Sequence, residues 1–71
     1  MNADEYIRTI GQNIVKQRVS KGIRQVDLAN LLNMDDSSLR RLETGKTNPT
    51  VRTLHRIAEV LEIDVADLLK V

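Results

Sequence analysis

Residues 25–45 read QVDLANLLNMDDSSLRRLETG and carry the strongest structural signal in the sequence. Apolar side chains recur within it at three- and four-residue spacing, which is typical of helices that are buried along one side. The spacing predicts one helix over residues 25–32, closing near Asn33, and another over residues 36–44, with Gly45 as its stop. The short polar link between the two groups predicts a tight turn.

The helical periodicity continues on both sides of this pair. Upstream, it predicts a helix over residues 3–21. Downstream, it predicts a helix over residues 51–61 with Thr50 as its cap. The spacing of two aspartates resembles a capping box for a last short helix over residues 64–69. No stretch reads as a strand, so the sequence predicts an all-α fold of five helices.

Length and composition exclude several classes of protein. A chain of 71 residues leaves room for one domain over residues 1–71 and little room for an enzyme cleft. There is no cysteine, and the one histidine, His55, cannot hold a metal by itself. We therefore expect no disulfide, metal site, cofactor or catalytic activity, and nothing indicates a small-molecule ligand. With no membrane-length apolar run and no signal peptide, we expect a cytoplasmic protein.

Basic residues gather in the middle of the chain. The formal net charge is only +1, yet residues 16–56 hold nine Lys or Arg against four acidic residues, and both flanking segments are net acidic. This asymmetry is expected of a domain that meets nucleic-acid phosphates on one face. Ordinary surface charge produces the same count, so charge alone leaves both interpretations open.

The helix predicted over residues 36–44 has two different sides. At about 100° per residue, four polar side chains share one arc of about 140°, while the leucines lie on the other side. The four are Ser37, Arg40, Arg41 and Thr44. Arginine pairs with guanine, serine bonds several base edges, and an aspartate such as Asp36 accepts from cytosine. A helix with a solvated polar face has the same pattern, so the arc by itself leaves the function open.

From Ile10 to Leu69 the chain resembles the Cro and phage-repressor helix-turn-helix family, also called the Xre family. The resemblance is carried by RQVDLA at 24–29, LRRLETGK at 39–46 and NPT at 48–50, together with residues 10–11, 18, 21–23, 54, 57–58 and 61. These segments match in order and without gaps. The resemblance implies a compact lambda-repressor-like domain in which the second and third of five helices form the DNA-binding motif.

The resemblance also implies a role for each matching residue. Asp36, Ser37, Arg40 and Arg41 stand where members of the family read bases. Gln25 matches a glutamine that bonds a DNA phosphate and braces the recognition helix. Arg18 and Glu43 match a pair that commonly forms an internal ion pair, which we expect to be at least partly buried. The remaining residues expected at the DNA backbone are Arg24, Thr44, Lys46, Thr47 and Asn48.

Several positions depart from the family pattern, among them Gln17, which falls where the family often has leucine. Arg24 stands where serine or threonine usually caps the second helix, so that cap must come from elsewhere and Arg24 is free to reach phosphate. Asn33 replaces the usual glycine of the turn, a change that asparagine tolerates because it adopts positive φ readily. Asp35 and Asp36 bring two carboxylates towards a phosphate backbone; we expect Asp35 to cap the third helix.

The sequence predicts a DNA-binding transcriptional regulator, with repression as its expected mode. One short recognition helix reads few base pairs, so we expect a homodimer on double-stranded DNA with a pseudo-palindromic operator. Its expected seam is apolar surface at the last helix, from Val65, Leu68, Leu69 and Val71. The alternative is a protein-interaction module of the same fold, an antitoxin-like protein or a partner of the transcription machinery, which the acidic pair and the low net charge favour.

Overall fold

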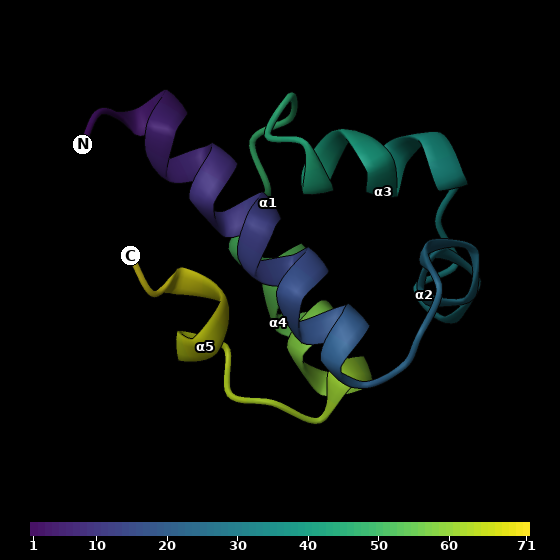
Figure 1. Cartoon of the computed structure of the whole chain (residues 1–71). Coiled ribbons are helices and arrows are strands. Elements are labelled where there is room, and N and C mark those ends of the chain that lie inside the picture. Colours follow the sequence, from purple (N-terminus) through teal and green to yellow (C-terminus); the bar gives the residue numbers. More distant parts are fainter.

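Helices occupy most of the chain, and the computed structural model describes all of residues 1–71 (Figure 1). In chain order the helices are α1 (Ala3–Ser20), α2 (Gln25–Leu31), α3 (Asp36–Glu43), α4 (Val51–Leu61) and α5 (Ala66–Leu69). There is no strand. The predicted all-α architecture of five helices is confirmed. The last predicted residues of the first three helices, Lys21, Leu32 and Thr44, are their C-caps.

Two of the helices begin with side-chain caps. The Asn2 side chain accepts a hydrogen bond from the Glu5 backbone N–H at 2.8 Å and starts α1. The predicted cap of α4 is present, since the Thr50 hydroxyl accepts from the Thr53 N–H at 3.0 Å. Each of these bonds satisfies one of the N–H groups that a helix start leaves without a partner.

The other two predicted caps are wrong. Asp35 occupies the N-cap position of α3, but its side chain makes no capping hydrogen bond. No capping box forms at α5 either. Asp64 accepts from the Ala66 N–H at 3.1 Å, whereas Asp67 pairs with Lys70 at 2.9 Å instead of reaching back. The hydrogen bond and the charge of Lys70 hold the pKa of Asp67 below its usual range.

The helix-turn-helix pair closes through a residue in the left-handed region. Asn33, between α2 and α3, has a φ of 55°, which is the conformation expected where the family has glycine. Glu62 adopts the same region, with a φ of 56°, and ends α4. This second left-handed residue was not predicted, because glutamate is not a residue type that favours positive φ.

Twelve buried apolar residues form a single core to which every helix contributes. They are Ile10, Ile14, Leu28, Ala29, Leu32, Leu39, Leu42, Leu54, Ile57, Ala58, Leu61 and Leu68. Helix α1 crosses the molecule, with α3 packed on one part of its surface and α5 on another (Figure 1). Because all five helices share one core, the position of α3 is fixed by its packing on both α1 and α2.

A glycine allows α3 to approach α1 very closely. A Cβ atom on Gly11 would lie 2.5 Å from the Leu42 carbonyl oxygen and 2.6 Å from the Glu43 carbonyl oxygen. The end of α3 therefore rests on the bare backbone of α1, where any larger residue would displace it. This contact sets how closely α3 approaches α1.

Polar side chains of α1 hold the C-terminal segment in place. The Tyr6 hydroxyl donates to the Leu69 carbonyl at 3.1 Å, and the Asn13 amide donates to the carbonyls of Leu68 and Lys70 at 3.0 and 2.7 Å. A helix of four residues leaves its final carbonyls without partners within the helix. Side chains from α1 supply those partners, so α5 is anchored by hydrogen bonds as well as by the buried Leu68.

Candidate nucleic-acid interface

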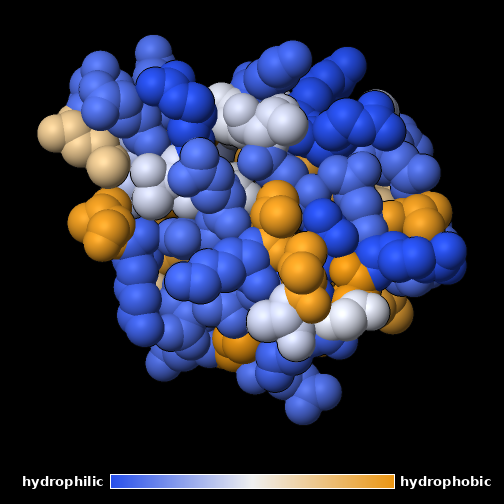
Figure 2. Space-filling view, in the orientation of Figure 1, coloured by the Kyte–Doolittle hydropathy of each residue, from blue (hydrophilic) through white to orange (hydrophobic).

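The outer face of α3 is polar and open to solvent. Asp36, Ser37, Arg40, Arg41 and Thr44 are all exposed, whereas Leu39 and Leu42 on the other side are buried in the core. The four residues predicted to read bases therefore lie on one accessible surface. Most of the molecular surface seen in Figure 2 is hydrophilic as well, so polarity alone does not single out this helix.

A shallow hollow of about 240 Å³ brings the predicted DNA-contacting residues together. It is lined by Ser37, Arg40, Arg41, Thr44 and Lys46, with no apolar residue among them. None of its three cationic side chains takes part in an ion pair within the protein. The hollow is therefore a concentration of positive charge and of hydrogen-bond donors that the fold itself leaves without anionic partners.

A second hollow of about 280 Å³ adjoins the first and shares Arg41 with it. Thr47 and Asn48 line this one, together with residues at the start of α4. The loop residues predicted to contact the DNA backbone are all exposed and lie beside α3. Arg41 stands between helix and loop, and its position is compatible with contact to either a base edge or a phosphate.

A buried ionic network ties the end of α3 to α1 and α2. The Arg18 guanidinium contacts both carboxylate oxygens of Glu43, with Nε to Oε2 at 2.8 Å and Nη2 to Oε1 at 3.2 Å. The side chains are only 13% and 3% exposed, respectively. Arg18 also donates to the Ile23 carbonyl at 3.0 Å, which fixes the segment between α1 and α2. This is the pair anticipated from the family pattern.

Gln25 completes this network. Its Nε2 atom donates to Glu43 Oε1 at 2.7 Å, so the first residue of α2 is bonded to the last residue of α3. The bracing role implied by the family resemblance thus has a direct geometric basis. Gln25 is half-buried, and its amide group has further hydrogen-bonding capacity beyond the bond to Glu43.

Arg24 has a partner within the protein, contrary to the expectation that it is free. Its Nε atom lies 2.8 Å from Asp27 Oδ2, and Nη2 lies 3.2 Å from Oδ1. The arginine holds the pKa of Asp27 below its usual range by hydrogen bonding and by charge, and Asp27 raises the pKa of Arg24. Arg24 remains 77% exposed, so this surface pair leaves it accessible while partly neutralising it.

Two of the acidic residues work against an anionic partner. Asp35 and Asp36 are exposed at the beginning of α3, and neither side chain has an ion pair or a hydrogen bond in the protein. The start of a helix favours negative charge, which gives these carboxylates a reason to be there. They confine the positive surface to the later part of α3 and its loop.

Some basic side chains of the central segment are held by partners within the protein. Three of its nine basic side chains have internal partners: Arg18 with Glu43, Arg24 with Asp27, and Arg56 with the Leu32 carbonyl. The Arg56 contact connects α4 to the end of α2. A count of charges does not show which basic side chains have internal partners.

These features together define a class of protein. The chain has a pair of short helices, α2 and α3, joined by a tight turn. The second helix is polar on its outer face and is held to its neighbours by a buried ion pair. This is the architecture of a helix-turn-helix regulator. A family profile described as helix-turn-helix matches residues 14–68 of the chain.

Individual relatives agree with this class. The uncharacterized HTH-type transcriptional regulator y4dJ of Sinorhizobium fredii is 31% identical over 61 residues, covering 86% of this chain and 79% of that protein. The ImmF control region 10 kDa protein of Bacillus phage phi105 is 31% identical over 58 residues, covering 82% of this chain and 64% of that protein. The crystal structure of the restriction-modification controller protein C.AhdI from Aeromonas hydrophila is similar, with a TM-score of 0.82 and 29% identity, over 87% of this chain and 94% of that one.

The chain belongs to the Cro and phage-repressor, or Xre, helix-turn-helix family, as its sequence motifs indicated. The lambda-repressor-like fold is likewise confirmed. These relatives are named as regulators and control proteins, in agreement with the prediction that the chain is a regulator and not an enzyme. No helix is long and apolar enough to span a membrane.

Proposed function

We propose that this protein is a sequence-specific transcriptional repressor that places α3 in the major groove of DNA. The observation that carries the proposal is the hollow of about 240 Å³ on the exposed face of α3, where three cations without anionic partners stand beside two hydroxyl groups. Arginine and serine at the base edges and lysine at the phosphates fit the donor and acceptor pattern of a duplex. A protein bound at its DNA site keeps other proteins off that stretch of DNA, and this exclusion would repress transcription.

The buried network supports this assignment because recognition requires a rigid helix. Glu43 is bonded to Arg18 and Gln25, so the last turn of α3 is fixed relative to both α1 and α2. Side chains on a fixed helix lose less freedom on binding than those on a mobile one. We propose that Gln25 uses its remaining amide capacity to contact a phosphate, in addition to its bracing role.

Selection of bound duplexes from a random pool tests the proposal directly. Enrichment of one short motif, arranged as an inverted repeat, is the expected result. Recovery of duplexes without a common motif would show that the protein binds DNA only through phosphates, and recovery of none would contradict DNA binding altogether.

A second candidate is favoured by the exposed carboxylates Asp35 and Asp36. They stand at the beginning of α3 with no partner in the protein, where they would repel phosphate and attract a basic protein surface. In this alternative the same fold is a protein-interaction module, antitoxin-like or bound to the transcription machinery. The absence of any DNA motif in the selection would favour it.

Two alanine variants should distinguish contacts to base edges from contacts to the DNA backbone. Arg41→Ala is expected to lower affinity for the selected site by about 1–3 kcal/mol and to relax preference at one base pair. Lys46→Ala is expected to weaken binding to selected and random duplexes alike, and to reduce the slope of log affinity against log salt by about 0.9 per monomer. Both variants remove one positive charge from the same hollow, so each controls for the other. Equal losses on both duplexes would show that Arg41 does not read sequence.

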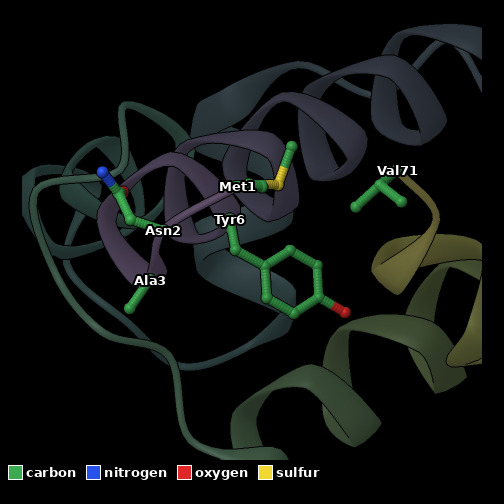
Figure 3. A pocket seen from close by; sticks show the side chains of 5 residues that line it. All are labelled: Met1, Asn2, Ala3, Tyr6 and Val71. Carbon is green, nitrogen blue, oxygen red and sulfur yellow. The ribbon is translucent and has the colours of Figure 1, made fainter.

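We propose that two copies bind together through apolar surface near the chain ends. Of the predicted seam residues, Leu68 is fully buried and belongs to the core, which corrects that part of the expectation. Val65 is partly buried against the core, whereas Leu69 is 37% exposed and Val71 is 87% exposed. A hollow of about 320 Å³ lies beside them, lined mainly by Met1, Ala3, Tyr6 and Val71 (Figure 3).

The surface around this hollow suits a second copy. Apolar atoms lie near both chain ends on the left of Figure 2, interrupted by hydrophilic groups. Acidic Asp4 and Glu5 stand at the beginning of α1, and basic Lys70 follows α5. A patch that contains both charges can pair with itself about a two-fold axis. Such a dimer would place its two α3 helices at half-sites about 34–36 Å apart.

Val71→Glu is expected to weaken dimer formation. A carboxylate placed in an apolar seam loses hydration without gaining a partner, so the dimer dissociation constant should rise by at least about tenfold, or about 1.4 kcal/mol. Sedimentation velocity over a concentration series measures the change. Val51→Glu is the matched control, because Val51 is 81% exposed but lies at the start of α4, outside the hollow. Equal association of wild type and Val71→Glu would contradict the seam.

A further inference from the structure

Arg8 of α1 lies directly against the loop that follows α3. A Cβ atom built on Gly45 would be 2.5 Å from Arg8 Cγ, 2.7 Å from Arg8 Cα and 3.1 Å from Arg8 Cβ. The Gly45 backbone therefore rests on the backbone and aliphatic stem of Arg8, with nothing between them. Figure 1 shows this loop passing beside the first half of α1. Gly45 also has a φ of +74°, so both its conformation and its contact require glycine.

This contact brings the stem of Arg8 next to the loop that supplies one side of the cationic hollow. Lys46, which lines the hollow, is the next residue after Gly45. The guanidinium carbon is three bonds beyond Cγ, so the charged end of Arg8 is no further from the loop than the rest of its side chain is long. Sequence patterns do not indicate this proximity, because Arg8 and Gly45 are far apart along the chain and Arg8 lies outside the central basic segment.

The charge of Arg8 is not neutralised within the protein. Arg8 is exposed and takes part in no side-chain hydrogen bond and none of the four ion pairs. Asp4, one helical turn earlier, is not paired with it. By contrast, Arg18, Arg24 and Arg56 are all held by internal partners. Arg8 thus shares the state of Arg40 and Arg41, which the proposed function assigns to DNA.

We propose that Arg8 is a further phosphate-binding residue, which extends the DNA interface from the loop onto α1. The proposal rests on the DNA binding proposed above. The aliphatic stem of Arg8 supports Gly45 and so positions the loop. The Arg8 guanidinium contacts a phosphate group next to the phosphate that Lys46 contacts. The contact adds affinity without sequence preference, because it reaches phosphate and no base.

The test measures binding to a short mixed-sequence DNA duplex across a salt series. Arg8→Gln removes the charge but keeps a stem of similar length over Gly45, and its melting temperature shows whether the fold is intact. Arg8→Lys keeps the charge. Lys16→Gln is the matched control: it removes one exposed, unpaired charge from the same helix, two turns further along and away from the loop.

We expect Arg8→Gln to reduce the salt slope by about 0.9 per monomer, so the ratio of wild-type to variant affinity falls about 3.5-fold between about 50 and 200 mM salt. Arg8→Lys should restore most of the slope, and Lys16→Gln should leave it unchanged. An unchanged slope in Arg8→Gln, or an equal loss in Lys16→Gln, would overturn the proposal while DNA binding itself stands. Wild-type protein that does not bind the duplex would overturn the proposed function, and the role of Arg8 with it.

Discussion

Replacing Glu43 with alanine is expected to lower the free energy of unfolding by about 3–5 kcal/mol. The Arg18 guanidinium, 13% exposed, would lose both of its carboxylate contacts and remain as an uncompensated charge among buried atoms. Gln25 would lose its bond to the same carboxylate. Small domains are stable by only about 5–15 kcal/mol, so the loss is a large part of the total.

Thermal and urea unfolding followed by circular dichroism measure this change. Asp27→Ala provides the control, because Asp27 also pairs with an arginine, but at the surface, with the two side chains 77% and 44% exposed. An exposed pair contributes about 0–1 kcal/mol, so this variant should melt close to wild type. Similar stabilities for the two variants would mean that the Glu43 network contributes no more than a surface contact.

Arg18→Met combined with Glu43→Leu sharpens the same prediction. Replacing both members of a buried pair by apolar residues is often neutral or stabilising, since no charge remains without a partner. The double variant should therefore be more stable than Glu43→Ala alone. It should nonetheless bind DNA more weakly, because Gln25 and the last turn of α3 would no longer be joined.

The second large effect is expected at Gly11, where alanine should destabilise the protein by about 1–3 kcal/mol. Replacing glycine by alanine within a helix normally stabilises by about 0.5–1 kcal/mol, so the expected sign is opposite to the helix propensity. The reason is the contact with α3, where the new Cβ would meet the carbonyl oxygens of Leu42 and Glu43 at 2.5 and 2.6 Å. These are backbone atoms, which yield only if α3 moves as a whole.

The displacement of α3 gives this prediction a second measurement. A shifted recognition helix should lose affinity for the selected DNA site even where the protein remains folded. Gly22→Asn is a suitable control, because asparagine tolerates the Gly22 φ of +70° and a Cβ atom built there meets nothing within 4 Å beyond its chain neighbours. If Gly11→Ala raised the melting temperature, as an ordinary helical alanine does, the close approach of α1 and α3 would be refuted.

Local signals in the sequence were sufficient for the helices and for the surface of α3. Periodic leucines and isoleucines, Gly22, Gly45 and Thr50 placed the elements within two residues, because caps and apolar periodicity act over short distances along the chain. The same periodicity separated the exposed arc with Arg40 and Arg41 from the buried leucines.

Contacts between distant residues were beyond the reach of such signals. Glycine is an unfavourable residue within a helix, and the sequence does not show why it stands at position 11. The structure shows the reason, because the carbonyl oxygens at the end of α3 lie too close for a Cβ atom. Asp35 has the right residue type and position for a cap, yet its side chain makes no such bond. Leu68 belongs to a short amphipathic segment in which the sequence does not distinguish core from seam, and its burial under α1 decides the matter.

Helix α1 connects the two surfaces through which this protein is proposed to bind DNA and a second copy of itself. One part of it holds α5 through Tyr6 and Asn13, while Gly11 and Arg18 hold α3. Eighteen residues of uninterrupted helix make this connection stiff. In a dimer joined near α5, this stiff helix would fix the distance between the two α3 helices and so the spacing of the half-sites. A DNA site with a different spacing would have to bend or twist to fit.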